Sequence, residues 1–117
     1  MTGISSVRTQ VSLWRWQRLS AMVLALAVCV HLFIIIFAVR QGLSAEAMLG
    51  RTRGSVVFAV FYGVFVLACA VHAPIGLLKI AEEWLDWRGR SVQLAALLLA
   101  LWILGAGLRA VYAVVAT

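Results

Sequence analysis

The chain divides into three long apolar runs separated by short polar segments. The first run, residues 19–39, contains no charged side chain in 21 positions. As an α-helix it would be about 31 Å long, which matches the ~30 Å hydrocarbon core of a bilayer. Residues 55–78 are also uncharged, and the third run begins at residue 92 and continues past Arg109. The pattern predicts an all-α membrane protein with three transmembrane helices, at about 19–39, 55–79 and 92–115.

Composition indicates the same class. Of the 117 residues, 65% are apolar and 12% are charged, and the mean hydropathy is +1.07. A soluble domain averages roughly 45–50% apolar residues, so too few polar side chains remain to cover a compact core in water. One domain usually takes about 100–200 residues, which predicts a single transmembrane domain over residues 1–117. The first run exceeds the ~7–15 apolar residues of a secretory signal, so we expect it to be retained.

The charged residues mark the ends of the apolar runs. The formal net charge is +6, from 10 basic and 4 acidic residues. Because the basic side chains flank the runs rather than form one face, they indicate membrane topology and not nucleic-acid binding. Six lie before the first run or between the second and third, against at most four on the other side. This excess predicts a cytoplasmic N-terminus and a C-terminus outside. Four tryptophans fall at the cytoplasmic interface: Trp14, Trp16, Trp84 and Trp87.

Two histidines, His31 and His72, lie inside the apolar runs. An ionisable side chain at membrane depth is a functional-site hypothesis by default. The alternative is a hydrogen bond between helices, worth ~0.6 kcal/mol on average, and both interpretations stay open. Counted from the cytoplasmic helix ends, His31 lies about 20 Å deep and His72 about 10 Å deep. Two imidazoles that clamp one haem iron must share a depth, so a haem ligand on this chain implies a second chain.

Further candidate residues lie near the histidines and the cytoplasmic interface. Gly76, one helical turn after His72, would let a flat macrocycle approach the backbone, although a small residue serves helix packing equally well. The rigid, permanently charged guanidinium of Arg18 suits a haem propionate or a quinone carbonyl, and the alternative is an arginine that snorkels to the interface. Donors and flat rings gather in this region at Ser12, Trp14, Arg18 and Ser20.

The chain carries no motif of soluble-enzyme chemistry. It has no Walker loop, no dinucleotide-binding glycine fingerprint, no Cys-x-x-Cys pair and no Ser/His/Asp set. Cys29 and Cys69 lie inside apolar runs, where we expect small apolar residues rather than a disulfide. A small transporter is an alternative hypothesis, but it would need a functional charge at the midplane or inverted repeats, and neither is visible.

The start of the first run resembles the cytochrome b membrane-anchor subunit of succinate dehydrogenase and fumarate reductase, the quinone-linked respiratory enzymes. In that family the first helix opens with a Ser-x-x-His-Arg-x-Ser-Gly stretch. Arg18 and Ser20 match this stretch, whereas Gln17 and Ala21 replace the histidine and the glycine. Ser12 matches the upstream serine only with a shift of position.

The second run resembles the second helix of the same family. That helix has a haem-ligating histidine, a glycine four residues later, an Ile-Arg-His stretch and then an acidic residue. His72, Gly76 and Glu83 fit this order, and residues 77–79 depart from the Ile-Arg-His stretch. With the three-helix topology, the resemblance covers most of the chain.

The resemblance implies a function for the whole chain. It implies that His72 is an axial ligand of haem b and that a quinone binds near the cytoplasmic side. Candidate contacts for a haem propionate or a quinone are Ser12, Trp14, Arg18 and Ser20. A flavoprotein and an iron–sulfur subunit would dock on the cytoplasmic side and carry the dicarboxylate reaction, so this chain would not be catalytic alone.

The same resemblance implies that each haem is held jointly by this chain and a partner. The second axial ligand would come from a second anchor subunit or from another copy of this chain. Members with two haems carry a distal ligand on the first helix, and His31 lies at the level such a ligand needs, which gives the hypothesis of a second haem.

The expected location is the cytoplasmic membrane of a prokaryote. A haem-free structural anchor of the same complex is the alternative.

Overall fold

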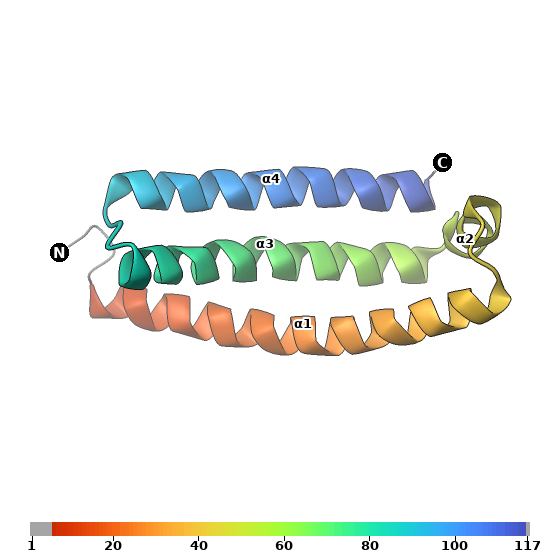
Figure 1. Ribbon diagram of the computed structural model, residues 1–117, viewed down its shortest axis with the longest axis horizontal. Coiled ribbons are helices and arrows are strands. Elements are labelled where there is room, and N and C mark those ends of the chain that lie inside the picture. Colours follow the sequence, from red (N-terminus) through yellow and green to blue (C-terminus); the bar gives the residue numbers. More distant parts are fainter. Residues whose placement is uncertain (1–5, 117) are drawn as a thin grey trace.

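The computed structural model describes residues 6–116, and its regular secondary structure over that range is entirely α-helical. Three long helices lie side by side in Figure 1: α1 (Val7–Gln41), α3 (Val56–Trp84) and α4 (Arg90–Val115). A short helix, α2 (Ala45–Thr52), lies between α1 and α3 in the chain. Each of the long helices is long and apolar enough to cross a membrane. The prediction of an all-α membrane protein with three transmembrane helices is confirmed.

α3 lies between α1 and α4 in the view of Figure 1. It runs antiparallel to α1 and α4 and packs against both, whereas α1 and α4 make little contact with each other. The helix bundle is elongated, with a longest dimension of 53 Å and transverse dimensions of 24 and 23 Å. Its N-terminal end holds the start of α1 and the connection from α3 to α4, and its α2 end holds α2 and the last turn of α4. Side chains on α3 can therefore meet partners from both outer helices.

Few side chains are buried within this bundle. Leu78, Ala81 and Val92 form a small cluster near the N-terminal end. Large apolar side chains are exposed instead, including Phe33 at 72% and Leu26 at 70%. Lipid tails are as apolar as these side chains, so helices in a membrane associate through close packing and hydrogen bonds rather than through apolar burial. The polar contacts between helices are therefore informative about what holds this fold together.

α1 begins at Val7, well before the predicted start at residue 19. Ser6 is its N-cap, and the Ser6 hydroxyl oxygen accepts a hydrogen bond from the Thr9 amide. This contact satisfies one of the amides that the start of a helix leaves unpaired. The additional turns carry polar and charged residues, so an apolar run does not reveal them. α1 thus extends beyond the hydrocarbon span toward the interface.

The polar segment between the first two spans contains α2, which the apolar pattern does not predict. The Ser44 hydroxyl oxygen accepts a hydrogen bond from the Ala47 amide, and Glu46 lies in the first turn. Both features favour the start of a helix, because they satisfy free amides and complement the positive end of the helix dipole. At eight residues, α2 is too short to show a clear apolar period.

The segment at the end of α2 caps the last turn of α4. The Thr52 hydroxyl donates to the Val114 carbonyl at 2.7 Å, and the Gly54 amide donates to the Val115 carbonyl at 2.7 Å. The last four carbonyls of a helix have no donor within the helix. Gly54 has φ +74°, in the left-handed region that favours glycine. These contacts tie α2 to the end of α4.

Thr52→Val is expected to lower the free energy of unfolding by about 1 kcal/mol, the usual net contribution of one hydrogen bond. The Val114 carbonyl loses its donor in this variant, while the volume of the side chain hardly changes. The matched control is Thr52→Ser, which keeps the hydroxyl. Unfolding in detergent, followed by circular dichroism, measures the difference. Equal stability of the Val and Ser variants would show that this bond does not hold the end of α4.

Candidate functional site

The first polar contact at membrane depth joins α1 to α3. His72 Nδ1 lies 3.4 Å from Ser20 Oγ, and Ser20 is only 5% exposed. The Ser20 hydroxyl donates its proton to the Gln17 carbonyl at 3.1 Å. In the His72 tautomer that carries its proton on Nδ1, the same oxygen can accept a hydrogen bond from Nδ1–H. In a neutral imidazole this tautomer leaves the lone pair on Nε2, where it can bind a metal or accept a proton.

Gly76 lies one turn beyond His72 and faces α1. A Cβ at Gly76 would lie 3.2 Å from the side-chain nitrogen of Gln17. The missing side chain thus gives the Gln17 amide its space between the two helices. Oε1 of Gln17 is buried without a hydrogen-bond partner, so an unused acceptor lies in this interface. Of the two interpretations of Gly76, helix packing is the one supported by a visible contact.

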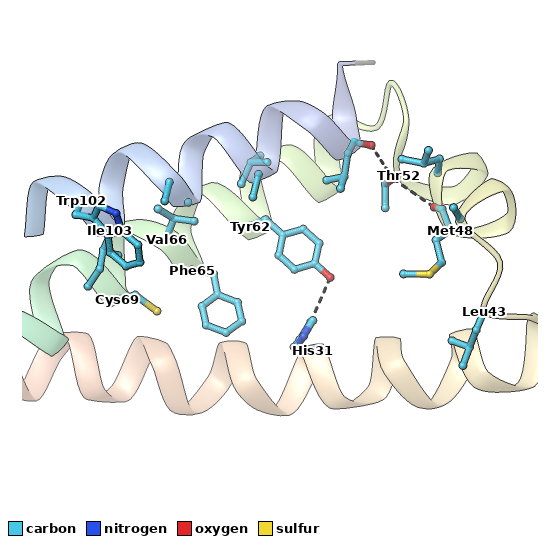
Figure 2. Close-up of a pocket in the computed structure, with 17 residues that line it drawn as sticks. His31, Leu43, Met48, Thr52, Tyr62, Phe65, Val66, Cys69, Trp102 and Ile103 are labelled. Carbon is cyan, nitrogen blue, oxygen red and sulfur yellow. Dashed lines mark hydrogen bonds between the residues drawn. The ribbon is translucent and has the colours of Figure 1, made fainter. Parts of the chain in front are cut away.

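The second polar contact also joins α1 to α3, nearer to the α2 end. His31 Nδ1 lies 3.2 Å from the Tyr62 hydroxyl. The imidazole meets the rings of Tyr62 and Phe65 edge to face, with centroid distances of 5.7 Å in both cases. Figure 2 shows Tyr62 reaching from α3 toward His31 on α1. The orientation of the His31 ring is therefore set by two aromatic neighbours and one hydrogen bond.

Three side-chain contacts fix the register of α1 against α3, joining Gln10 to Lys79 at 2.6 Å, Ser20 to His72 and His31 to Tyr62. His31 is thus level with Tyr62, ten positions before His72 on α3. Ten residues of helix span about 15 Å. The two histidines lie at different depths, and one metal ion cannot bind both.

A cavity of about 950 Å³ adjoins His31 near the α2 end. All four helices contribute to its walls, which are mostly apolar (Figure 2). His31 and Tyr62 bring polar atoms into this lining, and Thr52 lies at its α2 side. Ligand pockets of ~300–1,000 Å³ with apolar walls and a few fixed polar groups are typical of small-molecule and cofactor sites.

The residues expected to contact a propionate or a quinone do not lie together. The Arg18 guanidinium lies over the Trp14 ring, 5.2 Å from its centroid, and both side chains are exposed on α1. Ser12 is also exposed, whereas Ser20 is buried against His72. Ser20 thus contacts His72, the candidate haem ligand. Arg18 and Trp14 are exposed instead, where lipid or a partner chain can reach them.

Tyr62 is the residue of this site that sequence reasoning missed. A phenol inside an apolar run needs a hydrogen-bond partner once it is buried, and this signal was present in the sequence. Choosing His31 as that partner required the register of α1 against α3, which the apolar runs do not define.

Within residues 6–116, no three His, Cys, Asp or Glu side chains converge on a position where they could hold one metal ion. His72 and His31 each stand as a single protein ligand candidate. The chain matches no protein-family model, no curated protein and no solved structure.

Proposed function

We propose that the chain is the haem b-binding membrane-anchor subunit of a succinate:quinone oxidoreductase, a succinate dehydrogenase or fumarate reductase. The observation that carries the proposal is the contact between His72 and Ser20. It engages Nδ1 of an imidazole inside a membrane-spanning helix, and in the Nδ1–H tautomer Nε2 keeps its lone pair for a ligand. Metal-binding histidines usually have such a hydrogen bond on the second ring nitrogen, because it fixes the tautomer and the ring orientation.

The available donors suit a haem iron. A structural or catalytic zinc ion takes three or four protein ligands, whereas the macrocycle of a haem leaves only axial positions for the protein. His72 would supply one axial ligand. Since His31 lies about 15 Å from that level, the opposite ligand would come from a partner chain, either a second anchor subunit or another copy of this chain.

The residues of this chain have separate roles in the proposal. Ser20 orients the His72 imidazole through the contact of Oγ with Nδ1. Arg18 and Trp14, with Ser12, offer a cation and donors at the N-terminal end for a propionate or a quinone. A bound haem b supplies one-electron transfer between an iron–sulfur subunit and the quinone pool. Dicarboxylate chemistry belongs to the partner subunits.

The partners and the location follow from the charge pattern and the resemblance. The N-terminal end carries the larger number of basic residues, which favours the cytoplasmic side. A flavoprotein and an iron–sulfur subunit would dock at that end, in the cytoplasmic membrane of a prokaryote. Quinone would reach the site from the lipid.

His31 supports a second haem in the same proposal. It faces a cavity large enough for a cofactor, and its Nδ1 is also held, by Tyr62. A haem-free anchor is the second candidate function, because each histidine already bonds a side chain of the neighbouring helix as packing contacts do. The haem content of the purified complex distinguishes the two.

Purification of the tagged chain from its own membranes in a mild detergent tests the proposed complex. Flavin, acid-labile sulfide and succinate-dependent quinone reduction are expected to elute with the chain. A tagged, membrane-inserted chain that carries none of these would contradict the assignment to a succinate:quinone oxidoreductase. A detergent that strips the soluble subunits is recognised by crosslinking the membranes before extraction.

A further inference from the structure

We propose that Tyr62 is the positioning residue of His31, and that it fixes His31 as a haem ligand facing the cavity near the α2 end. The inference rests on the proposed function and adds to it a residue that the family resemblance does not include. It begins from the 3.2 Å contact between His31 Nδ1 and the Tyr62 hydroxyl. When Nε2 binds iron, Nδ1 carries the proton and donates it to the phenol oxygen.

The Tyr62 ring is itself held in place by its neighbours on α3. It stacks on Phe58 with a centroid distance of 5.9 Å and an interplanar angle of 18°, and it meets Phe61 edge to face at 4.9 Å. Aromatic pairs in these geometries stabilise one arrangement by about 0.5–1.5 kcal/mol beyond the area that they bury. The hydroxyl therefore presents a fixed acceptor to His31 rather than a mobile one.

The His31 ring is held from two sides. The plane of the His31 ring makes an angle of 85° with the Tyr62 ring and 82° with the Phe65 ring, so both contacts are edge to face. A ligand whose ring orientation is fixed by packing and by a second-shell hydrogen bond needs little reorganisation when it binds a metal. These contacts would fix the orientation of the His31 ring before a metal binds, as Ser20 would do for the His72 ring.

The volume and the apolar lining of the cavity suit a mostly apolar cofactor beside His31. Its volume is about 950 Å³, and the α4 wall includes the short side chains of Ala106 and Ala110. The Thr52 hydroxyl donates to the Val114 carbonyl, so its proton is already engaged. His31 is thus the nitrogen base of this lining, and its position is governed by Tyr62.

A hydrogen bond from Nδ1–H has a measurable effect on a metal ligand. It raises the basicity of the imidazole, which favours the oxidised iron, and its loss typically costs 10–100-fold in metal affinity. Tyr62→Phe removes the hydroxyl and keeps the ring. We expect this variant to lose haem from the His31 site to excess apomyoglobin about 10–100-fold more readily, and to raise the midpoint potential of the His31-dependent haem.

Tyr112→Phe is the matched control. Tyr112 is 65% exposed on α4 and does not line the cavity beside His31, so its variant loses the same hydroxyl outside the proposed site. The control should keep the haem retention and both potentials of the wild type. The His72-dependent haem provides a second reference within each sample, because Tyr62→Phe should leave it unchanged.

His31→Ala supplies an independent variant should Tyr62→Phe assemble poorly. It is expected to lower the haem content by the His31-dependent share while flavin is retained. Unchanged haem content in His31→Ala, or unchanged retention and potential in assembled Tyr62→Phe, would overturn the inference. In either case a haem that is lost with His72 would leave the proposed function intact. A wild-type complex without haem would overturn both.

Discussion

Replacing His72 by alanine is expected to abolish the haem b that this residue ligates. Haem b is not covalently attached, so an axial imidazole is a main contribution to its retention. The signal should disappear if one haem is present and fall by half if His31 holds another. The haem-to-flavin ratio of the detergent-purified complex measures the loss, because flavin reports how much of the complex has assembled.

Two variants make the His72 result specific. His31→Ala removes an imidazole at the other depth and should leave the His72 haem in place. Ser20→Ala keeps Nε2 but removes the acceptor of Nδ1–H, so haem affinity should fall about 10–100-fold rather than vanish. An unchanged reduced-minus-oxidised spectrum in His72→Ala would show that the imidazole is a packing contact between α1 and α3.

Gly107→Ala is expected to destabilise the fold by about 1–3 kcal/mol, the usual cost of excess volume in a close-packed contact. A Cβ at Gly107 would lie 2.6 Å from Val66 Cγ1 and 2.8 Å from its Cγ2. Valine has little freedom to rotate away because it is branched at Cβ. α3 and α4 would have to separate, and denaturant unfolding in detergent measures the loss.

Gly105→Ala is the matched control for Gly107→Ala. Gly105 lies on the same helix, and a Cβ there would meet nothing within 4 Å. Its substitution should be neutral or stabilise α4 by up to about 1 kcal/mol, because alanine is the better helix former. Equal effects of the two substitutions would show that Gly107 acts through helix propensity and not through contact with Val66.

The spans themselves were predictable from the sequence. Three apolar runs of membrane length, the third of which contains Arg109, appear as α1, α3 and α4, since a bilayer admits few other structures for such runs. α2 and the first turns of α1 were missed because caps such as Ser44 and Ser6 define them, rather than apolar length. Polar helical turns outside the bilayer leave little mark on hydropathy.

The orientation of each helix about its axis was the harder part. A membrane helix is apolar on all sides, so it has no apolar stripe to show which face packs. The sequence placed Arg18 and Ser20 in one candidate site, but they lie on different sides of α1, and Ser20 faces His72. The pairing of His31 with Tyr62 depends on the same rotation and on the register between helices.

The most direct test of the central claim is a reduced-minus-oxidised visible spectrum of the wild-type complex, with haem and flavin quantified in the same sample. The account predicts a b-type spectrum and at least one haem for each flavin. A complex that retains flavin and reduces quinone but shows no haem would contradict it. His72 and His31 would then be hydrogen-bonding residues of a haem-free anchor.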